Sequence, residues 1–359
     1  NSAIDPYQTI AGLSKYDYLF GEDASNKFFA YRPSMIPNKD LGWEISRTAN
    51  FGVDFGLWNN RISGYIEGYI TKTSDLLMER TLPFFTGFSK VWQNIGKTEN
   101  KGIELNIQAN TLKTKSFSWE TTVTFARNWN KITELLGGGD IRNNSWFIGK
   151  PLQVHYNYEM IGVWQLGEEK EAQKYGAIPG DIKVKDQNND GSIGELDKVI
   201  LGQKDPKIIA SLLNSFRFGA FDASINLNMN FGSLIHPNTY ASLITRDGLR
   251  WMPSNFKYWT PDNPTNEYTR ADKLSGYDPF AGTGGYMKGD YIKIQDITLG
   301  YDFSKIMPKN WKILRARLYA QVRNLGYIYK ACKNDVSPEA PDFDYNIPTT
   351  YTMGINIDF

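Results

Sequence analysis

The stretch FDASINLNMNF (221–231) decides the fold, because its residues alternate strictly between apolar and polar. Phe221, Ile225 and Leu227 stand at odd positions with other apolar residues, and the even positions carry Asp, Ser and Asn. Successive side chains of a β-strand point to opposite faces, so this pattern places all the apolar side chains on one face. The stretch therefore predicts a strand with one apolar and one polar face.

The same alternation recurs along the chain and predicts about ten strands. They run about nine to eleven residues, the length at which a tilted strand crosses a bilayer, whereas strands of globular proteins more often have five or six. We expect these strands at residues 48–58, 61–73, 101–112, 117–130, 153–164, 208–219, 221–232, 290–303, 313–324 and 351–359.

Tight turns alternate with long connections between these strands. Asn59-Asn60 and Gly219-Ala220 are tight turns, and a change of phase at Gln295-Asp296 predicts a β-bulge. Tight turns on one rim and long loops on the other are typical of outer-membrane barrels. The long connections are 74–100, 131–152, 165–207, 233–289 and 325–350.

Composition excludes several other classes of protein. Forty Lys and Arg against 39 Asp and Glu give a formal net charge of +1, which supplies no basic field for nucleic acid. With Cys332 as the only cysteine, and His155 and His236 as the only histidines, there is no disulfide framework and little material for zinc sites or Ser-His-Asp chemistry. No apolar run approaches the roughly 18 residues of a membrane-spanning helix.

A soluble sandwich or jelly roll also has alternating strands and is the alternative fold. In the long strands of this chain, one face is almost uniformly aliphatic or aromatic over about ten residues, and the other carries Asn, Arg, Glu and Gln. A sandwich strand usually has a shorter apolar stretch. We therefore predict an all-β fold, a transmembrane antiparallel β-barrel in the outer membrane.

The last nine residues form a strand that ends on an aromatic residue. Alternating hydrophobicity with a terminal aromatic resembles the signal read by the outer-membrane insertion machinery. An ordinary last strand that happens to end on Phe is the alternative. The residues of this candidate signal are Tyr351, Met353, Ile355, Ile357 and Phe359.

Several stretches resemble the SusC/RagA family of TonB-dependent outer-membrane transporters, in the family's order and over most of the chain. LGWEISRTANFGVDFGL (41–57) is similar to a strand entry of that family, and TGFSKVWQNIGKTENKGIEL (86–105) is the most distinctive match. The others are WFIGKPLQVHYNYEMIGVWQ (146–165), PGDIKVKDQNNDGSIGELDKVILG (179–202), YWTPDNPTN (258–266) and YIKIQDITLGY (291–301).

The resemblance implies an energised importer. In this family a plug fills a barrel of about twenty-two strands, a SusD-like surface lipoprotein covers it as a lid, and the TonB-ExbB-ExbD complex drives transport. The cargo is mostly oligosaccharide, or peptide in some members. The chain departs from this pattern, because residues 1–359 contain no plug, no TonB box and about half of the strands.

We therefore expect about ten C-terminal strands of a larger barrel in the outer-membrane lipid, with energy coupling through the missing N-terminal part. The segment 1–40 has the pattern of a loop. We expect strand 48–58 to pair with a preceding strand outside this sequence, and 351–359 to close onto the first strand of the complete barrel. An open edge in hydrocarbon would leave backbone donors and acceptors unpaired.

One loop carries the spacing of a calcium site. Asp186, Asn188 and Asp190 stand at positions 1, 3 and 5, a glycine stands at position 6, Ser192 at position 7 and Asp197 at position 12. Oxygen ligands at this spacing converge on one Ca²⁺ ion, although Asp at position 12 reaches less far than the usual Glu. A polar turn without an ion is the alternative.

Aromatic residues in the longest loop are candidates for contact with a sugar or with the lid. These are Trp251, Tyr258 and Trp259, and packing within the loop is the alternative for all three. No residue pattern supports catalysis, so we expect a transporter and not an enzyme. The rival interpretations are a siderophore or cobalamin receptor, and a soluble secreted carbohydrate-binding β-protein.

Overall fold

The computed structural model describes residues 12–20, 26–245, 256–270, 280, 282–304, 306–308, 313–333, 336–341 and 347–358. The chain divides into two compact units. Unit 1 comprises Asn1–Phe51, Gly68–Gly102 and Asn128–Gln153, and unit 2 comprises Gly52–Glu67, Ile103–Arg127 and Val154–Phe359.

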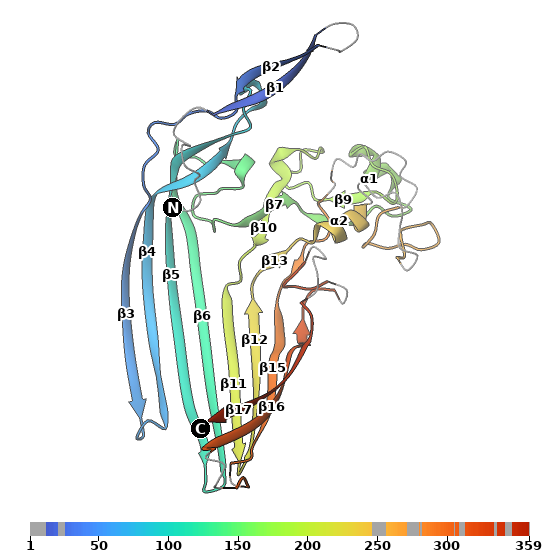
Figure 1. Ribbon diagram of the computed structural model, residues 1–359. Helices are drawn as coiled ribbons and strands as arrows, with labels where there is room; N and C mark the ends of the chain where they lie inside the picture. Colours follow the sequence, from blue (N-terminus) through green and yellow to red (C-terminus); the bar gives the residue numbers. More distant parts are fainter. Residues whose placement is uncertain are drawn as a thin grey trace. The chain divides into compact units, whose positions relative to one another are not determined.

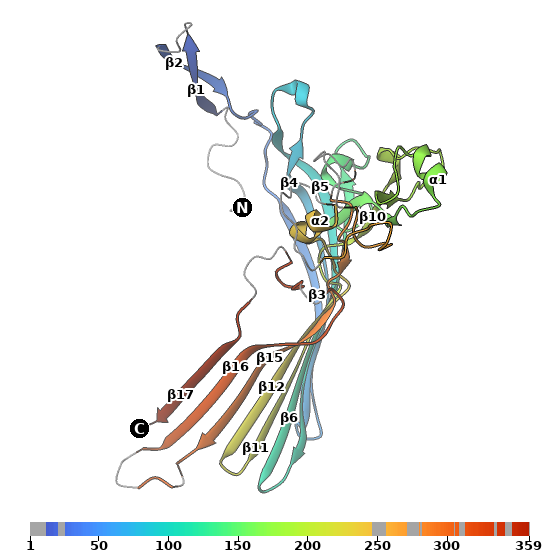
Figure 2. The same cartoon turned by 90° about the vertical axis from the view of Figure 1, so that its right-hand side faces the viewer.

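Nine strands form one sheet in the order β17-β16-β15-β12-β11-β6-β5-β4-β3. From β6 to β17 each neighbouring pair is antiparallel, and Figure 2 shows β11, β12, β15, β16 and β17 side by side. The bounds are β3 Ile45–Leu57, β4 Ile62–Thr81, β5 Lys90–Lys113, β6 Phe117–Leu135, β11 Ile208–Phe218, β12 Phe221–Phe231, β15 Tyr291–Asp302, β16 Arg315–Lys330 and β17 Thr350–Asp358.

Nine of the ten predicted strands lie in this sheet, which confirms the two-residue period as the signal of the fold. The two end strands, β3 and β17, each have a single neighbour in the sheet order. That they pair with strands outside this sequence stays a prediction.

The tenth predicted strand, 153–164, is wrong as a spanning strand. It forms two short strands, β7 Val154–Tyr158 and β8 Met160–Val163, outside the large sheet. β7 pairs with β10 (Lys198–Gln203) and β8 with β9 (Ile182–Val184). The apolar side chains at both ends of the segment are buried within the loops, so its alternation reflects a loop core and not contact with lipid.

Two segments of unit 1 that were predicted as loops contain strands. β4 continues to Thr81 and β5 begins at Lys90, so most of 74–100 is a hairpin extension. Within 1–40, β1 (Leu13–Phe20) pairs with β2 (Asn26–Pro33), which Figure 1 shows as a separate hairpin. Neither segment has a long run of alternating apolar and polar residues. The two-residue period therefore does not predict these strands.

The predicted turns and bulge are confirmed. Asn59 and Asn60 have φ angles of 55° and 58°, and Gly219 has φ 60°, as tight turns require. Asn226 pairs with Asp296, whereas Leu227 pairs with Ile294. Gln295 is therefore the extra residue of a β-bulge.

In unit 2, the connections fold into a second structure that we call the loop body, residues 154–207 and the described parts of 233–289. Figure 1 shows its elements at one end of β11 and β12. Tyr240 and Ile244 of its second helix pack with Cys332 and Val336 in a buried core. Its remaining elements are α1 Glu169–Lys174, the 3-10 turn Glu195–Asp197, β13 Leu234–Ile235, α2 Asn238–Thr245 and β14 Met287–Lys288.

Two further 3-10 turns, Phe84–Thr86 and Arg142–Asn144, belong to unit 1. Among the described residues, no helix has the length and apolar character needed to cross a membrane.

Candidate functional site: a polar sheet face and a folded loop body

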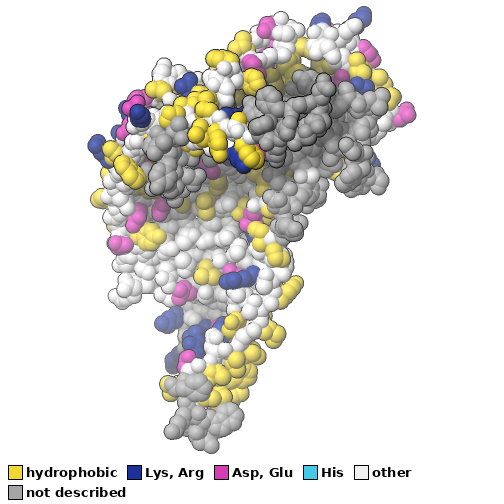
Figure 3. Space-filling model, turned by 45° about the horizontal axis from the view of Figure 1, so that its top comes forward, with side chains coloured by type: hydrophobic (Ala, Val, Ile, Leu, Met, Phe, Trp, Pro, Cys, Tyr) yellow, Lys and Arg dark blue, Asp and Glu magenta, His cyan; other side chains and the backbone are white. Residues whose placement is uncertain are grey.

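One face of strands β11 to β16 carries a series of cross-strand polar contacts. Arg317 donates two hydrogen bonds to the carboxylate of Asp222, at 2.8 and 2.5 Å. Further pairs on this face are Asn226 with Asp296 (3.2 Å), Asn228 with Gln295 (3.3 Å) and Asn230 with the Tyr291 hydroxyl (2.9 Å). The sheet surface seen in Figure 3 is mostly uncoloured, with charged side chains of both signs scattered over it. Such a face suits the wall of a water-filled lumen.

The opposite face of the same strands is apolar and exposed. The register places Phe221 opposite Tyr301, Tyr301 opposite Leu318, and Leu318 opposite Ile355. These rings and aliphatic chains have no covering element among the described residues. An open groove of about 350 Å³ is lined by Phe221, Tyr301 and Leu318 with their neighbours. A continuous apolar face of this kind is stable only against lipid or another apolar surface.

The amide oxygen of one polar side chain on this apolar face has two hydrogen-bond partners. The Asn214 Oδ1 accepts hydrogen bonds from the Trp119 Nε1 at 2.9 Å and from the Thr121 hydroxyl at 2.8 Å. Both partners come from the neighbouring strand β6. Because an unpaired polar group in hydrocarbon costs several kcal/mol, these two hydrogen bonds reduce the cost of an Asn on a lipid-facing surface.

The four described members of the candidate insertion signal share one face of β17. Tyr351, Met353, Ile355 and Ile357 alternate along the strand, and all four are exposed. Phe359 lies outside the described residues. The alternation and exposure of these four residues agree with the expected signal. That the insertion machinery recognises them stays a prediction.

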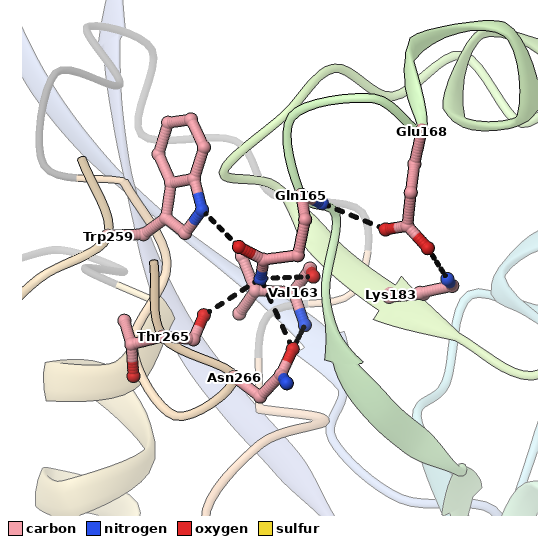
Figure 4. Close-up of polar contacts among 7 residues, drawn as sticks. All are labelled: Val163, Gln165, Glu168, Lys183, Trp259, Thr265 and Asn266. Atoms are coloured by element: carbon pink, nitrogen blue, oxygen red, sulfur yellow. Dashed lines mark hydrogen bonds and ion pairs between the residues drawn. The ribbon is translucent and has the colours of Figure 1, made fainter. Parts of the chain in front are cut away.

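Gln165 joins two parts of the loop body that are distant in sequence (Figure 4). Its side-chain oxygen accepts a hydrogen bond from the Trp259 Nε1 at 2.8 Å, and its nitrogen donates to the Thr265 carbonyl at 3.1 Å. Asn266 supports the same link, because its Oδ1 accepts from the backbone N–H of Val163 at 3.2 Å. These hydrogen bonds connect the segment 163–165 to the segment 259–266.

The same link requires a glycine at position 180. Gly180 has φ 90°, and a Cβ there would lie 2.6 Å from the Trp259 ring. Arg270 donates its backbone N–H to the Gly180 carbonyl at 2.8 Å and its Nε to Asp181 at 3.0 Å. Positive φ and close approach of a ring together favour glycine at this position.

The structure places Tyr258 and Trp259 in the interior of the loop body, with exposed fractions of 9% and 6%. The Tyr258 ring packs against Phe256 and Tyr268, with centroids at 6.1 and 5.8 Å. Both residues therefore pack the loop in this structure, and direct contact with a ligand or lid stays a prediction. Trp251 lies outside the described residues.

The predicted calcium loop forms a turn held by its own side chains. Asp186 accepts hydrogen bonds from the N–H groups of Asn189 and Gly191, and the nearly fully buried Asp197 accepts from Gln187 and Gly194. The Asn188 Oδ1 accepts the N–H of Asp190, and Asp190 accepts the N–H and hydroxyl of Ser192, which hold the pKa of the Asp190 carboxyl below its usual value.

This arrangement suffices for a turn without an ion. Among the described residues, no three His, Cys, Asp or Glu side chains come together as a group that could hold a metal ion. The carboxylates of Asp186, Asp190 and Asp197 accept backbone hydrogen bonds instead. Calcium binding stays a prediction from the spacing alone.

Both histidines lie in one aromatic cluster that sequence reasoning did not find. The Nε2 atoms of His155 and His236 donate to the carbonyls of Leu234 and Gly284, at 2.9 and 3.0 Å, and both rings contact Tyr286. Burial lowers the pKa of His155 to about 4, so the ring is neutral at pH 7. The cluster joins β7 to the β13–β14 pair and has a structural role here.

We predict that Gln165→Leu opens the loop body locally, because it leaves the buried Trp259 N–H without an acceptor. A buried donor without a partner costs about 1–3 kcal/mol, which corresponds to amide hydrogen exchange faster by roughly 5- to 150-fold. Exchange at residues 163–165 and 259–266, followed by mass spectrometry, measures this. The matched control is Gln173→Leu, an exposed position in α1, and equal exchange in both variants would contradict the prediction.

A calorimetric titration decides the calcium hypothesis. With mixed oxygen ligands and Asp at position 12, we expect a dissociation constant of roughly 10⁻⁴–10⁻³ M. Asp190→Ala should abolish the binding heat, and Asp262→Ala, an exposed carboxylate elsewhere in the loop body, should leave it unchanged. No binding heat at millimolar calcium would establish the plain turn.

Comparisons with known proteins agree with this geometry. The family model "TonB dependent receptor-like, beta-barrel" matches residues 14–325. SusC, a TonB-dependent receptor of Bacteroides thetaiotaomicron, is 28% identical over 95% of this chain and 34% of its own length. Two proteins of Formosa agariphila named TonB-dependent receptors are 27% and 28% identical over all of this chain, which spans 39% and 38% of them.

A solved structure of the RagAB peptide transporter matches the fold. It superimposes with a TM-score of 0.77 over 100% of this chain and 40% of that chain, at 22% sequence identity. The chain thus spans about two fifths of the length of the relatives it matches. This chain belongs to the TonB-dependent receptor β-barrel family and is an outer-membrane β-barrel protein of the SusC/RagA type.

Proposed function

We propose that this chain supplies strands and loops of an importer that moves an oligosaccharide or a peptide across the outer membrane with energy from TonB. The observation that carries the proposal is the two-faced sheet, whose polar contacts run from Asp222 and Arg317 to Asn230 and Tyr291. A water-filled passage needs one polar wall, and the lipid needs the other face apolar. The RagAB peptide transporter shares this type of fold, and SusC is similar in sequence.

The cargo follows from the relatives and not from a ligand site in this chain. The match to a peptide transporter supports a peptide. The resemblance of the sequence motifs to the SusC/RagA family, whose cargo is mostly oligosaccharide, supports an oligosaccharide. A siderophore or cobalamin is the alternative cargo, because TonB-dependent receptors include both. The rival interpretation as a soluble secreted carbohydrate-binding protein is excluded, because the chain is an outer-membrane β-barrel protein. We assign no reaction to the chain, and its named relatives are receptors and transporters.

A SusD-like lipoprotein lid is the partner we propose for the loop body. Four aliphatic side chains of this region are exposed although the region is folded: Ile161, Leu166, Ile178 and Leu196, with exposed fractions of 49–68%. A protein that covered these side chains would remove their apolar surface from water, which favours association. The Gln165 link holds the segment that carries Ile161 and Leu166 in one conformation.

Growth and uptake test the transport proposal. A strain that lacks the complete protein should lose growth on one oligosaccharide or peptide mixture as the sole nutrient, and a protonophore should abolish uptake of the labelled nutrient in the parent strain. Normal growth on all such nutrients, together with failure only under iron or cobalamin limitation, would establish the alternative cargo.

Co-purification in mild detergent tests the lid. Leu166→Glu with Leu196→Glu should reduce recovery of a lipidated partner, because charges replace apolar contacts. Leu314→Glu is the control, an exposed leucine just before β16 and outside the loop body. Equal recovery from the double variant and the control would contradict the lid proposal without affecting the transport proposal.

A further inference from the structure

A group of basic side chains lies on the apolar face of strands β3 to β6, which we call the basic cluster. Arg47 of β3, Lys72 of β4, Lys97 and Lys101 of β5, and Lys131 of β6 form it. Along each strand they alternate in phase with exposed apolar residues, since Arg47 shares the parity of Phe51, and Lys72 that of Ile70. The cluster therefore faces the lipid and not the lumen.

The height of the cluster follows from the length of the strands. Arg47 and Lys72 stand about 12 residues from the tight turn at Asn59-Asn60. At about 3.3 Å per residue and a tilt of about 40°, this distance corresponds to roughly 30 Å along the membrane normal. The apolar band of such barrels is about 25 Å tall, so the cluster lies at the boundary of lipid tails and headgroups on the long-loop side.

Charges within the cluster do not cancel. Glu99 lies among three lysines, with its carboxylate 3.2 Å from Lys101, 3.2 Å from Lys131 and 4.0 Å from Lys72. Lys97 pairs with Glu134 at 2.7 Å and interacts with Asp75. The five cations thus exceed the three carboxylates.

Two of the cations are available to a ligand. Arg47 has no hydrogen bond or ion pair to any described residue, and the Lys72 side chain is 71% exposed. Both line a groove of about 740 Å³ on this face, together with Lys97, Lys101, the single carboxylate Glu99 and the aliphatic Ile70. A groove with cations beside an exposed aliphatic wall fits a molecule with an anionic head and apolar tails.

We propose that the basic cluster binds the headgroup phosphate of a lipid with net negative charge in the outer leaflet, with the acyl chains lying over Ile70 and Phe51. Lysine and arginine near a membrane surface attract anionic headgroups, and their apolar stems remain against the hydrocarbon. Phe51 is 76% exposed and continues the apolar face next to the cluster. The site would hold structural lipid around these strands, independently of the cargo.

Native mass spectrometry of the complete protein in detergent, titrated with dimyristoyl phosphatidic acid or dimyristoyl phosphatidylcholine, tests the proposal. Phosphatidic acid should be retained preferentially, and Lys72→Gln with Lys101→Gln and Lys131→Gln should lower its retention by about tenfold or more. The matched control removes three exposed lysines of the loop body: Lys170→Gln, Lys174→Gln and Lys185→Gln. Phosphatidylcholine retention should be equal in all variants.

A variant that is expected to increase lipid retention separates loss of binding from misfolding. Glu99→Gln removes the central carboxylate, so it should increase retention of phosphatidic acid severalfold. Equal retention of the two lipids, or equal loss in the triple variant and its control, would overturn the proposal. Displacement of the lipid by an equal concentration of inorganic phosphate would also overturn it, because it would assign the cluster to a soluble anion.

Discussion

A strand in hydrocarbon must give every backbone N–H and C=O to a neighbouring strand, since the lipid offers no hydrogen-bond partner. β12 has strand partners on both sides from Phe221 to Asn230, with β11 on one side and β15 on the other. At the bulge the register skips Gln295, and its side-chain oxygen accepts a hydrogen bond from the Asn228 amide. The side-chain chemistry of the two faces depends on this sheet, because only a paired strand keeps its alternate residues apart.

The backbone N–H and C=O groups of the loop body also need hydrogen-bond partners, although this part of the chain is not in lipid. Short strand pairs satisfy part of its backbone, and side chains such as Gln165 and Asn266 bind the carbonyls and N–H groups that remain. A folded loop with a fixed surface loses less entropy on meeting a partner than an unfolded one would. This property suits the contact with a lid that we propose for the loop body.

Most of the sheet could be predicted from the sequence, because alternation is a local signal that each strand carries alone. The segment 153–164 misled the prediction, since a half-buried loop strand and a half-lipid-facing strand have the same period. The Gln165–Trp259 contact could not be predicted, although both residues stand in stretches that resemble the family. A contact between residues 94 positions apart depends on the fold of everything between them.

The central claim is that β12 has one face in lipid and the other toward a polar lumen. The free energies of unfolding of Leu227→Arg and Asn226→Arg, measured by denaturant titration in lipid vesicles, test it most directly. Leu227 lies between Leu212 and Ile294, whereas Asn226 lies beside Asp296. The account predicts a cost of about 2–4 kcal/mol at Leu227 and a far smaller cost at Asn226. Equal costs at the two positions would contradict it.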